Sequence, residues 1–227
     1  MKRLQLSLSA LSLRGSTLLV TAALCCLIPL LPLPAQADDL DGIVSRLQVR
    51  YETVHELSAV FTQSNLSKGM GASLTTSGKV YFKKPGMMRW EYNNADGDLL
   101  ISDGSTIWLF QADLNQVIES SADGTGGALA HNFLAGMGRL RDDFDISLAN
   151  VSPKKYRLDL SPKVEHPSIA RLSIDVDRAT FLVTGTTVLD RFGNETMVTF
   201  SGMEIDRGLE PSLFTYTPPE GVIVVSP

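Results

Sequence analysis

The stretch Gly78-Lys79-Val80-Tyr81-Phe82-Lys83-Lys84-Pro85-Gly86-Met87-Met88-Arg89-Trp90-Glu91-Tyr92 decides the fold of this chain. Apolar and charged residues alternate on both sides of a Lys-Pro-Gly turn, which gives each strand one apolar face: Val80 and Phe82, then Met88, Trp90 and Tyr92. Pro85 presets a turn φ and Gly86 accepts a positive φ, so the connection can be tight. The stretch therefore predicts a β-hairpin whose apolar face needs a cover.

The first 37 residues have the pattern of a secretory signal peptide. Three basic residues precede an apolar run at 18–31, and the small-x-small triplet Ala35-Gln36-Ala37 follows it. The alternative is a membrane anchor, but the run is shorter than the roughly 18 residues that a spanning helix needs. We expect cleavage after Ala37, which leaves residues 38–227 as one domain.

Cys25 and Cys26 are the only cysteines, and both lie inside this apolar run. A lipid-modified N-terminus is disfavoured because neither follows a small residue and the apolar run continues through Leu27 and Ile28. The mature chain should therefore be free of cysteine, and its stability must come from an apolar core rather than from disulfides.

The charge of the mature chain argues against nucleic acid as a partner. Of the 20 Lys and Arg and the 25 Asp and Glu residues, three basic and no acidic ones lie in residues 1–37, so the mature net charge is −8. A surface that binds nucleic acid or anionic lipid usually has the opposite sign.

Two segments of the mature chain are expected to be helical. At 40–54, an apolar face recurs at helical spacing through Leu40, Ile43, Val44, Leu47, Tyr51 and Val54. After a Gly-rich break at 123–127, residues 128–140 repeat the pattern with Leu129, Phe133, Met137 and Leu140. Each segment has an apolar face to bury, so both are expected to form a lid.

The remaining pattern is that of a mainly β (α+β) protein. About eleven short strands are separated by turn residues, at 58–65, 75–83, 87–92, 99–102, 107–111, 116–119, 144–148, 156–160, 170–176, 181–189 and 195–205. Antiparallel strands in this number imply a large curved sheet that is open or nearly closed.

The concave side of such a sheet is the candidate binding site. Its expected lining residues are large and apolar: Phe61, Phe82, Met88, Trp90, Tyr92, Trp108, Phe133, Met137, Phe181, Met197, Phe200 and Met203. An ordinary solid core would show the same alternation, so both interpretations stay open. Flexible Met side chains among aromatic ones favour an adaptable cavity, because Met repacks around ligands of different shape.

The sequence shows little sign of catalytic or metal-binding motifs. The chain is therefore not expected to be an enzyme or to need a cofactor. His55, His131 and His166 lack metal-ligand spacing, and no Gly-x-Ser-x-Gly elbow or phosphate loop occurs. The acidic residues near 142–145 and 175–177 could meet calcium, but solvated carboxylates at strand edges are the simpler interpretation.

Several motifs resemble those of the LolA family of periplasmic carriers of outer-membrane lipoproteins. They run through the mature chain in the family's order: the hairpin Gly78–Gly86 and Met88–Tyr92, Ile101-Ser102-Asp103-Gly104 with Trp108, Asp113–Val117, and Phe214–Val222 near the end. The resemblance implies an unclosed β-barrel under a helical lid, working as a monomer in the periplasm of a Gram-negative bacterium. It further implies that acyl chains arrive from an inner-membrane ABC transporter of the LolCDE type and pass to an outer-membrane receptor such as LolB.

The resemblance also singles out Lys84. In family members an Arg commonly precedes the Pro of the hairpin turn and bonds to the backbone of the lid, and this chain has Lys84 there. Lys84 is thus the implied lid latch, although its ammonium lacks the planar fork of Arg. The alternative is a solvated turn lysine.

Two other function classes remain. A periplasmic lipid-binding or lipid-sensing regulatory domain could use the same barrel, although such regulators usually carry a second domain. A lipid-acting enzyme would need a nucleophile and a base that the sequence does not display.

Overall fold

The computed structural model describes residues 39–94, 97–122, 139–164 and 169–226. The chain's contacts divide it into Met1–Ala37 and Asp38–Pro227, and all described residues lie in the second unit. Some of the predictions fall outside the described residues. These are the signal peptide, the cavity residues Phe133 and Met137, and the lid residue Leu129. Within the described ranges, no helix combines the length and the apolar character needed to cross a membrane.

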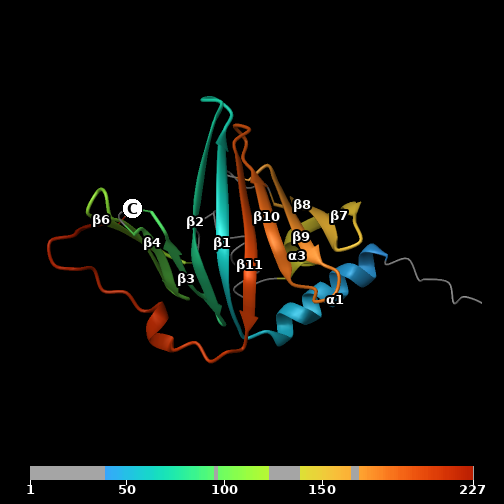
Figure 1. Cartoon of the computed structure of the whole chain (residues 1–227), viewed down its shortest axis with the longest axis horizontal. Helices are drawn as coiled ribbons and strands as arrows, with labels where there is room; N and C mark the ends of the chain where they lie inside the picture. Colours follow the sequence, from blue (N-terminus) through green and yellow to red (C-terminus); the bar gives the residue numbers. More distant parts are fainter. Residues whose placement is uncertain (1–38, 95–96, 123–138, 165–168, 227) are drawn as a thin grey trace, which may run out of the picture. The chain divides into compact units, whose positions relative to one another are not determined.

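The described unit is built on one twelve-stranded sheet (Figure 1). Its strands, in chain order, are β1 (Glu56–Ser67), β2 (Ala72–Lys83), β3 (Met87–Tyr92), β4 (Leu99–Asp103), β5 (Thr106–Gln111), β6 (Gln116–Ser121), β7 (Phe144–Val151), β8 (Lys155–Pro162), β9 (Arg171–Asp177), β10 (Val183–Leu189), β11 (Glu195–Ile205) and β12 (Ile223–Val225). The spatial order is β12-β6-β5-β4-β3-β2-β1-β11-β10-β9-β8-β7, so the sheet is unclosed, with β12 and β7 at its edges.

The eleven predicted strands are confirmed, and β12 is an addition. Every neighbouring pair is antiparallel except β12 and β6, which are parallel. β12 has only three residues and follows a Pro-rich segment, which explains why alternation alone did not reveal it.

The hairpin between β2 and β3 is the predicted one. Val80 pairs with Trp90 and Phe82 with Met88, which puts all four side chains on one face of the sheet. Gly86 has φ +69°, as the tight turn requires. We call the face that carries Trp90 the inner face, and the opposite one the outer face.

Helix α1 (Leu40–Thr53) supplies the cover for part of the inner face. Asp39 caps its N-terminus, since the Asp39 carboxylate accepts from the Gly42 backbone N–H at 2.7 Å. Its buried residues Ile43, Val44, Leu47 and Tyr51 belong to the same apolar core as the inner face. The short helix α3 (Leu140–Asp143) leads into β7 and adds Leu140 to that core.

A second, smaller apolar layer lies on the outer face. After β11 the chain passes through the 3₁₀ helix η1 (Pro211–Phe214), which contacts β3 and β4, and ends with β12 beside β6 (Figure 1). Phe214, Ile101 and Val117 are buried but stand apart from the inner core. Both faces of the β3–β6 region therefore carry apolar residues.

Candidate functional site

The inner face is centred on Trp90, whose ring is enclosed by other aromatic rings. The centroid of the Trp90 ring lies 4.7 Å from that of Phe61, 6.0 Å from Phe82 and 6.1 Å from Phe200. Phe61 also meets Tyr92 edge-on at 5.2 Å. The cluster is therefore a continuous aromatic surface across β1, β2, β3 and β11.

Gly78 makes this arrangement possible. A side chain at this position would place its Cβ 1.9 Å from the carbonyl oxygen of Glu91 and 2.8 Å from the Phe61 ring. Only glycine leaves room for the Phe61 ring and the Glu91 carbonyl at this point of β2.

Most of the predicted lining residues lie on or beside this surface. Phe61, Phe82, Met88, Trp90 and Phe200 are buried in the core, and Tyr92, Phe181 and Met203 are half-buried against it. Their proposed role in binding acyl chains stays a prediction.

The placement of Trp108 on the inner face was wrong. Trp108 pairs with Ile101, which pairs with Arg89, so all three lie on the outer face, opposite Trp90. There the Trp108 ring packs 6.3 Å from that of Tyr216, and its Nε1 donates to Glu119 at 3.1 Å. The error has a physical cause: the run at 107–110 is apolar on both faces because the C-terminal segment covers the outer one.

Met197 was also misplaced. It pairs with Ser64, on the face opposite the Phe61–Phe200 pair, and its side chain is 39 % exposed. Met203 returns to the inner side because the β1–β11 register shifts near Gly202, which has φ +58°. Residues three apart share a face only across such a bulge, so Met197 and Phe200 could not both point inward.

Tyr51, near the end of α1, joins the helix to the sheet in two ways. Its hydroxyl accepts a hydrogen bond from the Val183 backbone N–H of β10 at 3.1 Å, and burial raises the pKa of the phenol. Its backbone carbonyl accepts a hydrogen bond from the Lys84 ammonium. The sequence placed Tyr51 on the apolar face of the helix but gave no sign of these bonds.

The Lys84 contact is the one that a latch requires. The lysine lies in the β2–β3 turn, is half-buried, and reaches the last turn of α1. Desolvation lowers the pKa of its ammonium, and the nearby charges of Asp206 and Glu52 partly oppose that shift. Lys84 is therefore not a fully solvated turn lysine, whereas its role in closing a lid stays a prediction.

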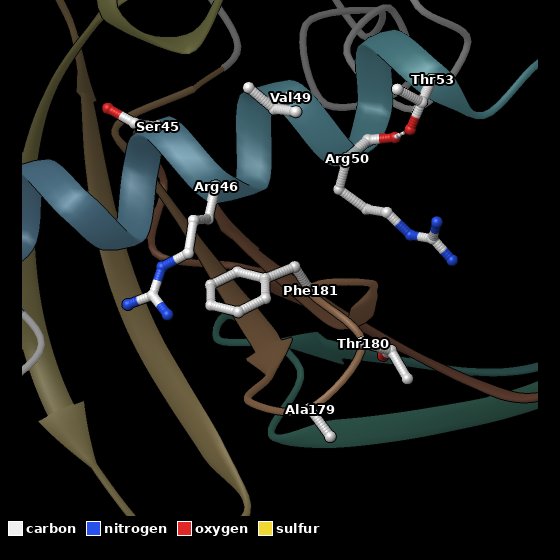
Figure 2. A pocket seen from close by; sticks show the side chains of 8 residues that line it. All are labelled: Ser45, Arg46, Val49, Arg50, Thr53, Ala179, Thr180 and Phe181. Atoms are coloured by element: carbon white, nitrogen blue, oxygen red, sulfur yellow. Dashed lines mark hydrogen bonds between the residues drawn. The ribbon is translucent and has the colours of Figure 1, made fainter.

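A groove of about 630 Å³ runs along α1 on the side of the β9–β10 turn (Figure 2). Its lining includes two arginines one helical turn apart, two threonines and two apolar side chains: Arg46, Arg50, Thr53, Thr180, Val49 and Phe181. A smaller groove of about 320 Å³ lies beside Gln48 and Arg141. Both grooves border the helix that covers the inner face.

Residues 52–217 match the family described as "Outer membrane lipoprotein carrier protein LolA". The chain belongs to the LolA family. The match spans the sheet from β1 to η1, so α1 and β12 lie almost wholly outside it.

Individual relatives agree with the family match. An outer-membrane lipoprotein carrier protein from Nitrosomonas europaea is 30 % identical over 86 % of this chain and 93 % of its own length. One from Cupriavidus pinatubonensis is 31 % identical over 82 % of this chain and 88 % of its own length. The solved structure of an uncharacterized conserved protein from Thermus thermophilus, 14 % identical, has a TM-score of 0.52 and covers 82 % of this chain and 98 % of that one. That likeness concerns the fold alone.

The LolA-type sheet carries no evident catalytic constellation in its described part. Among the described residues, no group of three or more His, Cys, Asp or Glu side chains is placed to hold a metal ion. The carboxylates of Asp103 and Asp177 serve their own turns: each accepts hydrogen bonds from backbone N–H groups two and three residues on, which lower their pKa. The presence of an acidic residue at these two positions is therefore explained by the turns that it stabilises, without a bound ligand.

Proposed function

We propose that this protein carries lipoproteins through the periplasm by holding their acyl chains against the inner face of its sheet. The supporting observation is that an unclosed sheet presents an aromatic inner face under a helix that is tied at one end by Lys84 and Tyr51. Each methylene removed from water contributes about 0.8 kcal/mol, so an acyl chain needs such a surface to cross an aqueous space. The names of the related proteins support the same cargo.

The route of the cargo is part of the proposal. Residues 1–37 would direct export and be removed after Ala37. A LolCDE-type ABC transporter in the inner membrane would load the carrier, and a LolB-type receptor in the outer membrane would accept the cargo. Binding then requires α1 to move from the inner face, and release is favoured when it returns.

Mass spectrometry of the protein purified from the periplasm tests the cargo. We expect triacylated lipoprotein to co-purify. Free lipid without lipoprotein would instead favour the lipid-sensing alternative, and neither species above the level of an unrelated periplasmic β-protein would contradict both.

Lys84→Leu tests the latch. Hydrogen bonds from a charged donor contribute about 1.5–3 kcal/mol, so their loss should shift the population toward the open form. We expect the variant to load lipoprotein from inner-membrane vesicles at least as well as the wild type, but to transfer it poorly to the receptor. Lys84→Arg, which keeps the charge and adds a forked donor, is the matched control and should release normally. Normal release by Lys84→Leu would show that closing does not depend on Lys84.

A further inference from the structure

The groove beside α1 has a positive rim and an apolar floor. Arg46 and Arg50 are four residues apart, so they project from the same side of the helix. The Arg46 guanidinium lies 4.7 Å from the centroid of the Phe181 ring, and Figure 2 shows that ring between the two arginine side chains. No Asp or Glu is among the described residues that line the groove.

The guanidinium of Arg50 contains a buried hydrogen-bond donor. Its Nε is shielded from water and lacks a partner among the described residues. A buried donor without an acceptor is unfavourable, and for a charged group the cost is larger than for a neutral one. An anionic group in the groove would pair with the guanidinium charge.

The two apolar side chains of the groove are unusual, Val49 for its exposure and Phe181 for its backbone conformation. Val49 is 58 % exposed on α1, although it could have been polar at no cost to the core. Phe181 has φ +55°, a conformation that bulky residues rarely adopt, in a turn closed by the bond from Phe181 N–H to the Asp177 carbonyl at 2.9 Å. Backbone strain of this kind clusters at active sites and at sites that hold a ligand.

We propose that this groove binds an amphipathic anion, with a phosphate or carboxylate at Arg50 and the adjoining alkyl segment along Val49 and Phe181. The volume of about 630 Å³ is within the usual range for small-molecule sites. Anionic phospholipids and free fatty acids share this chemistry. The proposal goes beyond the carrier role and does not depend on it.

Calorimetric titration of the full mature protein with four probes tests the proposal, each kept below its micelle concentration. Decyl phosphate and decanoate carry both features, inorganic phosphate carries charge alone, and decyl maltoside carries the chain alone. We expect at least one of the amphipathic anions to bind about tenfold or more tightly than both single-feature probes. Preference for decyl phosphate points to a phospholipid headgroup, and preference for decanoate points to a fatty acid. Because the inner face is proposed to take alkyl chains as well, the part of the binding that Arg50→Gln removes is compared between probes. If that part is equal for decyl maltoside, or absent for both anions, the proposal is overturned.

Arg50→Gln locates the site. Its side chain makes no hydrogen bond or ion pair with the described residues, so we expect an unchanged melting temperature and about a tenfold or greater loss of affinity for the preferred anion. Arg171→Gln removes the same charge from an exposed position on β9, outside this groove, and should bind as the wild type. Arg50→Lys should retain part of the affinity. An equal loss in Arg50→Gln and Arg171→Gln would reduce the effect to net charge and overturn the proposed site.

Discussion

Each face of the sheet is covered in part, and the two covers differ in construction. Part of the inner face lies under α1, which makes its backbone hydrogen bonds within itself and meets the sheet through side chains and Lys84. On the outer face, the C-terminal segment packs on β3 and β4 and adds β12 to the sheet through a backbone ladder with β6. A helix can leave a surface without losing its backbone hydrogen bonds, because these are internal. A strand that leaves its neighbour loses the backbone hydrogen bonds between them. The comparison indicates that the inner cover is the one able to move.

Polar contacts strengthen the outer cover along its length. Arg89 Nη1 donates to the Leu213 carbonyl at 3.3 Å, and Asn115 Nδ2 donates to the Gly221 carbonyl at 2.9 Å. The Ile223 N–H then donates to the Asn115 carbonyl at 3.0 Å. The outer layer is thereby part of the sheet's own framework, and we expect it to unfold only with the whole domain.

Phe214→Ala should have the largest effect on global stability. The Phe214 ring is fully buried in the outer layer, and truncating such a ring typically costs about 3–5 kcal/mol. We expect this loss in urea denaturation, with acyl-probe binding unchanged in the folded fraction. Phe192→Ala makes the same substitution at an 83 % exposed position and should change stability little. A loss below about 1 kcal/mol in Phe214→Ala would show that the C-terminal segment is not a fixed cover.

Leu47→Ala addresses the inner cover. Leu47 is fully buried under α1, and its truncation removes about 2–3 kcal/mol of contacts with the sheet. If α1 opens separately, most of this loss should appear as faster amide exchange in α1, with little change in β12 or in the urea midpoint. Val49→Ala, on the exposed side of the same helix, is the control. A drop in the urea midpoint as large as that of Phe214→Ala, without selective exchange in α1, would place both covers in one cooperative unit.

The difference between the covers also explains what the sequence could and could not predict. The Lys-Pro-Gly hairpin and the face that Trp90 occupies followed from local alternation, because only one side of β2 and β3 is continuously apolar. Trp108 lies in a strand that is apolar on both sides, so its face depends on the C-terminal segment, more than 100 residues away along the chain. Strict alternation from Phe200 is sufficient by itself to place Met197 on the opposite face.

Contacts between distant elements set the remaining limit. Lys84 was singled out by its place before Pro85, but its partner, the Tyr51 carbonyl, depends on how α1 meets the sheet. The Arg50 groove likewise requires a turn from residues 177–181, and no local pattern joins that turn to α1. Such pairs are fixed by tertiary packing, which the periodicity of one segment does not encode.

Glu56→Gln should have a smaller effect, at the junction where the chain leaves β11 for the outer face. Glu56 Oε1 accepts from the Lys83 ammonium at 2.7 Å, and Oε2 accepts from the backbone N–H groups of Gly208 and Leu209 at 2.7 Å. The bonds from Lys83 and from the Leu209 backbone lower the pKa of this carboxyl below its usual 4.5. A lowered folded-state pKa stabilises the protein above the unfolded-state value, and this contribution is lost as the pH falls through the folded-state value.

We therefore expect Glu56→Gln to lose about 1–2 kcal/mol at pH 7, because Gln keeps an acceptor but not the charge. The difference from the wild type should shrink as the pH falls below the unfolded-state pKa and through the lowered folded-state pKa, since the wild-type carboxyl is then protonated in both states. Urea denaturation at several pH values measures this difference in the free energy of unfolding. Glu204→Gln, at an exposed position on the same end of the sheet, is the charge-matched control. A pH-independent difference would mean that the carboxyl's charge does not hold this junction, and the outer cover would then depend on its other contacts, among them Phe214 and the β12 ladder.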